Sequence, residues 1–209
     1  MPRNERITPQ RSVRAAASRR ERSPAARVVL AALAAALVLF AWGFLYWTVL
    51  VPMPRIFGEP ADEEALSEAL VTYLLETDTY FLPVWRSESQ VMQSRFETGP
   101  VATIFFHREG VDVGSPLTYL LGYLQTAIAC LLAAMLLYRC GSALPSFGGR
   151  VGVVFLAGLC GTVMTALGGP IWWHQPWRFH LIYLLYAAVA WLLAGFVLAA
   201  LIKKGRLRF

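Results

Sequence analysis

The side chains best suited to chemistry are three histidines, two of which share one short aromatic segment. His174 and His180 lie in segment 171–180 together with Arg178, whereas His107 lies far upstream. A turn within this segment would place two imidazoles beside a guanidinium, and imidazoles can bind metals or haem and move protons. A zinc site needs three or four ligands, however, and the segment has no HxxxH or HxxEH pattern. We therefore predict no metal and no cofactor, and keep His107, His174, Arg178 and His180 as the candidate cluster of an alternative, enzymatic function.

The three cysteines give no sign of a second kind of site. Cys130, Cys140 and Cys160 form no CxxC pair and have no metal-binding spacing. The sequence also lacks a phosphate-binding loop and the Gly-x-Ser-x-Gly pattern of hydrolases. We expect thiols packed among apolar neighbours, and the pattern favours a non-enzymatic function over catalysis.

The composition indicates which elements must position these residues. Apolar residues make up 57% of the 209 residues and charged residues 15%, against about 25% charged residues in soluble domains. The apolar residues gather in four uncharged stretches, and a membrane-spanning helix needs about 20 such residues. The sequence predicts an all-α membrane protein, with four transmembrane helices and a small α+β extracytoplasmic cap between helices 1 and 2.

Cap and turn residues set the boundaries of the predicted elements. The first span follows Ser23-Pro24, a good N-cap and first helical residue. Its apolar part exceeds the 7–15 residues of a cleaved signal peptide, so we expect an uncleaved signal anchor. The predicted order is a basic cytoplasmic arm (1–27), span one (28–53), the acidic cap (54–116), span two (117–138), a cytoplasmic loop (139–150), span three (151–170), an aromatic outer loop (171–180), span four (181–202) and a basic cytoplasmic tail (203–209).

The distribution of charge predicts the orientation. Eight of the 19 basic residues precede span one, two lie in 139–150 and four in 203–209. Because cytoplasmic segments are enriched in Lys and Arg, both termini are expected in the cytoplasm, in agreement with an even number of spans. The predicted location is the cell (inner) membrane. Anionic lipid is a candidate partner of the arm, whereas nucleic acid is not expected, because no aromatic residues are interleaved there.

The cap is small and acidic. Segment 54–114 holds eleven acidic and four basic residues, a net charge of −7. Its pattern predicts an amphipathic helix over 62–77, an extended segment over 80–85, a short helix over 87–96 and a strand over 101–107. So few residues make a marginal core alone. The apolar face of the first helix is therefore expected to pack on the bundle, on lipid headgroups or on a partner protein.

The predicted spans carry no Asp, Glu, Lys, Arg or His, which argues against a proton-coupled pump or transporter. Span three instead carries two stripes of small residues, a pattern that lets helices approach closely. The predicted packing stripe is Ala157, Gly161, Thr165 and Gly169, and a second stripe of Gly158, Thr162 and Ala166 runs beside it.

Short patterns elsewhere carry a resemblance. They are Ala41-Trp42-Gly43, Thr98-Gly99-Pro100-Val101 and Trp191-Leu192-Leu193-Ala194-Gly195. In these the chain is similar to small bacterial inner-membrane proteins with one signal anchor, an acidic outer cap and three further helices. The resemblance implies that arrangement and no particular activity.

These features favour an accessory, assembly or stabilising membrane subunit whose acidic outer cap docks a membrane or extracytoplasmic protein. One alternative is a passive transporter or channel for an apolar or neutral solute, which a wide cavity between the helices would favour. The other is a membrane redox or lipid-handling enzyme that uses the outer His/Trp/Arg cluster, which convergence of the three histidines would favour.

Overall fold

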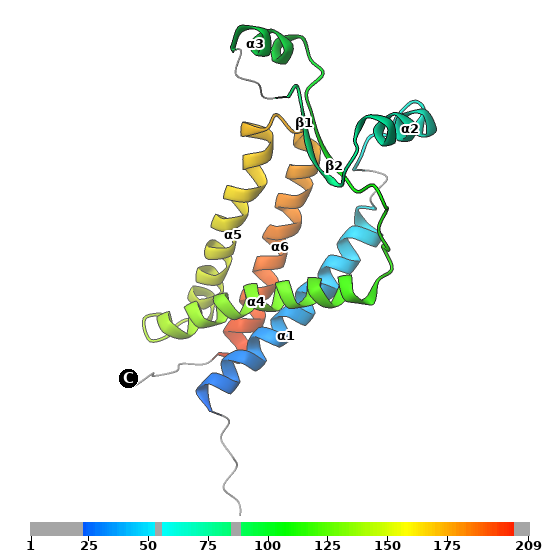
Figure 1. Ribbon diagram of the computed structural model, residues 1–209. Helices are drawn as coiled ribbons and strands as arrows, with labels where there is room; N and C mark the ends of the chain where they lie inside the picture. Colours follow the sequence, from blue (N-terminus) through cyan, green and yellow to red (C-terminus); the bar gives the residue numbers. More distant parts are fainter. Residues whose placement is uncertain (1–22, 53–55, 85–88, 203–209) are drawn as a thin grey trace, which may run out of the picture.

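The computed structural model describes residues 23–52, 56–84 and 89–202, and four long helices dominate it (Figure 1). The long helices are α1 (Pro24–Phe44), continued by the π-helical turn η1 (Leu45–Leu50), α4 (Pro116–Cys140), α5 (Phe147–Trp172) and α6 (Trp177–Leu201). All four are long and apolar enough to cross a membrane. The tail at 203–209 and most of the arm predicted at 1–27 lie outside the described residues.

Local signals explain where these helices begin. The Ser23 hydroxyl accepts a hydrogen bond from the Ala26 amide at 3.2 Å, and Ser146 caps α5 in the same way at 3.0 Å. Helix α5 continues through Pro170 and ends at Trp172, two residues past the predicted end of span three. The π-helical turn at the end of α1 was not predicted, because the apolar pattern is the same for either kind of helix.

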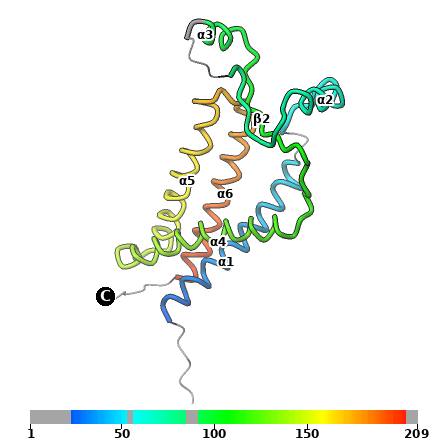
Figure 2. The backbone as a smooth tube through the Cα atoms, in the orientation of Figure 1, coloured from blue at the N-terminus to red at the C-terminus, as the bar shows by residue number. Residues whose placement is uncertain are grey.

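The helices pack through small residues. Helices α5 and α6 run side by side, α1 packs on α4 and α6, and α4 crosses the others at a steep inclination in Figure 2. The first residues of α1 and the last residues of α6 lie at the same end, opposite the cap (Figure 1). Alanines are more than half of the buried apolar residues in the described chain: Ala31, Ala32, Ala35, Ala36, Ala127, Ala133, Ala134, Ala166, Ala187, Ala190, Ala194 and Ala199.

Large apolar side chains face outwards. Leu37 and Leu132 are each 62% exposed, and Met164 is 75% exposed. A soluble bundle would bury these side chains and expose polar ones. A core of alanine and glycine beneath a surface of leucine is instead typical of helices that associate within lipid.

One stripe of α5 forms the helix contact. Gly158, Thr162 and Ala166 are buried, and a Cβ built at Gly158 would collide with the indole ring of Trp191 on α6. The absence of a side chain at Gly158 therefore lets that indole lie against the backbone of α5. Thr162 donates a hydrogen bond to the Gly158 carbonyl at 2.9 Å, so its hydroxyl is satisfied within its own helix, as is usual for threonine in apolar helices.

The prediction that the stripe Ala157, Gly161, Thr165 and Gly169 packs against another helix of this chain is wrong for its first three residues. Ala157, Gly161 and Thr165 are exposed, and nothing in the described chain lies within 4 Å of a Cβ built at Gly161. Only Gly169 lies close to another helix, against His180 in the first turn of α6. The two stripes are alike in sequence, and the position of Trp191 on α6 decides between them.

The cysteines fall into different environments. Cys130 is fully buried in the helical core, Cys140 is half-buried and Cys160 is exposed, and all three are free thiols. The expectation of packed thiols therefore holds for Cys130 and is wrong for Cys160. Cys160 lies on the exposed side of α5, next to Gly161.

The cap contains two short helices and one antiparallel pair of strands. They are α2 (Glu63–Tyr73), β1 (Asp78–Leu82), α3 (Ser89–Thr98) and β2 (Ala102–Phe106). Strand β1 pairs with β2 with Tyr80 opposite Ile104. All four elements fall where the sequence predicts them, and each is shorter than or shifted from its predicted range by a few residues, as is usual at element ends.

Candidate functional site

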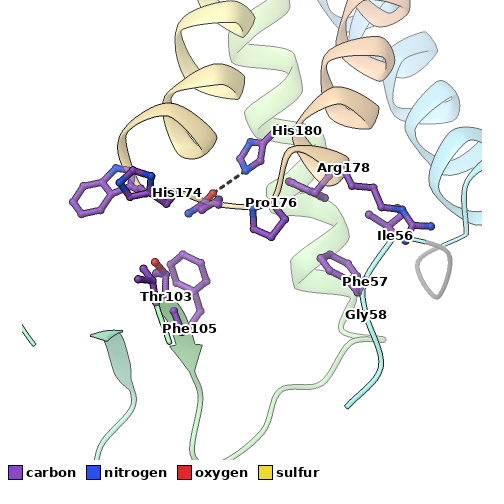
Figure 3. Close-up of a pocket in the computed structure, with 14 residues that line it drawn as sticks. Ile56, Phe57, Gly58, Thr103, Phe105, His174, Pro176, Arg178 and His180 are labelled. Carbon is purple, nitrogen blue, oxygen red and sulfur yellow. Dashed lines mark hydrogen bonds between the residues drawn. The ribbon is translucent and has the colours of Figure 1, made fainter. Parts of the chain in front are cut away.

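A cavity of about 770 Å³ lies at the cap end of the helices and is here called the cap-end cavity. It lies between strand β2, the segment after η1 and the turn that joins α5 to α6 (Figure 3). Its lining consists of Ile56, Phe57, Gly58, Val101, Ala102, Thr103, Phe105, Trp173, His174, Gln175, Pro176, Arg178, Phe179 and His180. The volume falls within the range of about 300–1,000 Å³ that is usual for small-molecule sites.

The turn between α5 and α6 is built around Gly169. The Gly169 carbonyl accepts hydrogen bonds from the Trp173 amide at 3.0 Å and the Gln175 amide at 3.3 Å. A Cβ at Gly169 would lie 2.5 Å from both Gln175 Oε1 and His180 Cε1. Glycine is therefore needed here so that these two side chains can lie against the end of α5.

His180 and Gln175 form the polar centre of the lining. His180 Nε2 lies 2.8 Å from Gln175 Oε1, and because an amide oxygen can only accept, the imidazole nitrogen donates this hydrogen bond (Figure 3). The bond fixes the plane of the imidazole and leaves the amide nitrogen of Gln175 as a donor. His174 lies on the other side of the turn with φ of 53°, a left-handed conformation that is uncommon for a residue other than glycine.

Helix α1 holds the start of α6 in place through aromatic side chains. Trp42 Nε1 donates to the Tyr186 carbonyl at 3.2 Å, and the Tyr46 hydroxyl donates to the Ile182 carbonyl at 3.0 Å. The π-helical turn contains both Tyr46 and Trp47. The ring of Trp47 stacks on Phe179 with centroids 6.3 Å apart. This contact holds the Phe179 ring in its position in the cavity wall.

Aromatic contacts also attach the cap to the helices. Phe57 stacks on Phe179 with ring centroids 5.8 Å apart. On the other side, Phe81 of β1 meets Trp173 edge to face at 5.8 Å. These two contacts flank the cap-end cavity, and β2 contributes Thr103 and Phe105 to its lining between them.

The structure brings together three of the four residues of the predicted cluster. His174, Arg178 and His180 line the cap-end cavity, whereas His107 is exposed just past the end of β2 and is not part of the lining. In the described part of the chain, no group of three or more His, Cys, Asp or Glu side chains could hold a metal ion. The arrangement can bind an anion or an amphipathic molecule, since it combines donors with a largely apolar wall.

Sequence reasoning missed the contributions of the cap to this cavity. It predicted the strand that contains Thr103 and Phe105, but no local signal places that strand against the α5–α6 turn. Ile56 and Phe57 follow the first span closely, and no spacing pattern in the sequence links them to the α5–α6 turn. Gln175 lies within the aromatic segment, and nothing in the sequence reveals its hydrogen bond with His180.

No protein-family model matches the chain, and neither a curated protein nor a solved structure is similar enough to match it.

Proposed function

We propose that the chain is a multi-pass inner-membrane protein that acts as an accessory, assembly or stabilising subunit and docks a partner protein through its cap. The membrane location is supported by the alanine-rich core beneath exposed leucines and by four helices of spanning length. Basic residues are in excess before the start of α1 and after the end of α6. This excess supports a cytoplasmic position for both termini, and hence an extracytoplasmic cap.

The observation that carries the docking role is the uncovered apolar face of α2. Leu66, Leu70 and Tyr73 follow the spacing of one helix face, yet Leu66 is 48% and Tyr73 is 80% exposed. No residue of α2 is buried. By helical spacing, Glu64 and Glu68 lie on the opposite side, so the helix carries an apolar strip on one face and negative charge on the other.

Arg108 fixes the direction in which α2 presents this strip. One guanidinium nitrogen, Nη1, donates to the Val71 carbonyl at 3.0 Å and to the Leu74 carbonyl at 2.9 Å. A positive charge at the C-terminal end of a helix also interacts favourably with the helix dipole. The Asp62 carboxylate caps the other end by accepting from the Ala65 amide at 2.9 Å. A helix secured at both ends loses less conformational entropy when it binds.

The partner that fits this surface is a membrane protein with a basic, partly apolar extracytoplasmic segment. Opposite charge would steer its approach, and the apolar strip would supply most of the affinity. The surface is narrow, so binding to α2 alone would be weak, and neighbouring parts of the cap would have to contribute.

The test compares two charge substitutions on the same helix. Leu66→Glu places a carboxylate in the apolar strip, whereas Thr72→Glu adds the same charge at an exposed position outside the strip. Each full-length protein, wild type or variant, carries a photo-crosslinking residue in place of Tyr73. The proteins are purified from cells in mild detergent. We expect a defined cross-linked protein with the wild type and Thr72→Glu, and its loss with Leu66→Glu.

Thermal unfolding in detergent shows whether each variant is folded, and equal stabilities are expected because neither position is buried. If Leu66→Glu and Thr72→Glu give the same cross-linked products as the wild type, α2 is not the docking surface. The transporter alternative gains no support from the cavity, which lies at the cap end rather than between the long helices. For the enzymatic alternative, His174, Arg178 and His180 share the cavity but His107 lies outside it, so the three histidines do not converge.

A further inference from the structure

We propose that the cap-end cavity binds the phosphate headgroup of an anionic lipid from the membrane leaflet on the cap side. This inference rests on the membrane location proposed above and is independent of docking through α2. The cavity and α2 lie on different parts of the cap, so a substitution can remove one function and leave the other.

The position of the cavity matches the depth of lipid headgroups. It opens between the end of α5 and the start of α6, where Trp172, Trp173 and Trp177 are 78%, 57% and 49% exposed. Exposed tryptophans at the ends of membrane-spanning helices lie at the boundary between acyl chains and headgroups. A lipid can therefore reach the cavity by lateral diffusion without leaving its leaflet.

The charge of the lining selects an anion. Arg178 is the one charged residue among the described residues of the lining, His174 and the side-chain amide of Gln175 supply further nitrogen donors, and no carboxylate is present. The surrounding cap is strongly acidic by composition. The acidic surroundings by themselves repel anions, so the preference of the cavity comes from Arg178, and Arg is well suited to phosphate because its planar guanidinium offers paired donors.

The backbone adds to this preference. The first turn of α6 contains Arg178 and lines the cavity, and no side chain caps its N-terminal amides within the described chain. Amides at a helix N-terminus carry a partial positive charge that favours phosphate. Here they supplement a cavity whose charged side chain already favours an anion.

The remaining lining fits the part of a lipid next to its phosphate. Phe57, Phe105 and Phe179 form an apolar wall together with Ile56 and Val101. Such a wall suits the glycerol backbone and the first methylenes of the acyl chains, whereas it offers little to a fully hydrated ion. The combination therefore favours a phospholipid over free phosphate, which lacks the apolar part.

The experiment uses the full-length protein in a neutral detergent and follows tryptophan fluorescence. It is titrated separately with dioctanoyl phosphatidylglycerol, dioctanoyl phosphatidylcholine and inorganic phosphate. We expect phosphatidylglycerol to bind at least about tenfold more tightly than phosphatidylcholine, because the choline cation would oppose the charge of Arg178. Inorganic phosphate should neither bind comparably nor compete.

Two pairs of variants locate the binding site. Arg178→Gln should weaken phosphatidylglycerol binding by about tenfold, and its control Arg95→Gln removes the same charge from exposed α3 and should change nothing. Gly58→Trp should abolish binding by filling the cavity, because Gly58 lines it and nothing lies within 4 Å of a Cβ there. Its control, Gly148→Trp, adds the same indole at an equally open glycine in the first turn of α5.

Three outcomes would overturn the proposal. Equal binding of the two lipids would remove the charge selectivity, and unchanged binding in both Arg178→Gln and Gly58→Trp would place the lipid elsewhere. Competition by inorganic phosphate at the affinity of the lipid would assign the cavity to a soluble phosphate compound. If Arg178→Gln lowers the unfolding temperature, the binding affinity of Gly58→Trp alone decides whether the lipid binds in the cavity. Gly58→Trp adds its side chain in open space and is therefore not expected to disturb the fold.

Discussion

The two faces of α5 have almost the same sequence character and opposite surroundings. Gly158, with Thr162 and Ala166, is buried against α6, where the indole of Trp191 occupies the space that a side chain would need. Three residues further along the helix, Gly161 has open space around its Cα. Small residues at helical spacing therefore indicate that a close approach can occur, whereas the partner helix determines on which face it does occur.

The largest expected effect is at Gly158. Gly158→Leu would force the Trp191 indole away from α5, and overpacking of this severity costs about 3 kcal/mol of unfolding free energy. Thermal unfolding of the full chain in detergent, followed by loss of helical circular dichroism, measures the effect. Gly158→Ala should show a smaller loss in the same direction.

A double-mutant cycle ties that loss to the indole. When Trp191→Leu is present, the cost of Gly158→Ala should shrink, since the clashing ring has gone. A cost that stays the same in both backgrounds would mean that α5 and α6 do not approach as closely as described.

Substitution of Gly169 should lower the free energy of unfolding by an intermediate amount. Gly169 is the one residue of the predicted stripe that lies against α6. Gly169→Ala would press on Gln175 and His180, two side chains that can move more easily than a buried indole. We expect a loss of about 1–2 kcal/mol. His180→Ala should relieve part of this loss, and full persistence of the loss would argue that the turn backbone, not the imidazole, is strained.

The smallest effect is expected at Gly161. Gly161→Leu should leave the unfolding temperature nearly unchanged, and Gly161→Ala should raise stability by about 0.5–1 kcal/mol, because alanine is the better helix former. Both variants are measured beside Gly158→Leu in the same detergent. A substantial loss in Gly161→Leu would show that another protein or a second copy covers this face.

Long helices and cap elements were predictable from local patterns. Apolar length alone indicates the four helices, and Ser23-Pro24 and Asp62 mark helix starts that the structure retains. The strand over 102–106 follows from its β-branched and aromatic residues between turn signals. Each of these signals acts within a few residues of the chain, which is why sequence alone reveals it.

The candidate site was predictable only in part. The aromatic segment that contains His174 and His180 stood out by composition, but its neighbours in space come from residues 56–58 and 101–105. Contacts between distant segments depend on how the cap folds back over the α5–α6 turn, and no spacing rule encodes that. For the same reason, His107 was grouped with the other histidines although it lies outside the cavity.

The Arg108 contact with α2 has a consequence for how the cap can change over evolution. Both hydrogen bonds end on main-chain carbonyls, at Val71 and Leu74, and not on side chains. Substitutions along α2 therefore leave these acceptors in place as long as the segment stays helical. The exposed strip of Leu66, Leu70 and Tyr73 can thus drift in sequence without releasing the helix, and a library of α2 sequences on a constant scaffold should contain folded proteins with altered partner preference.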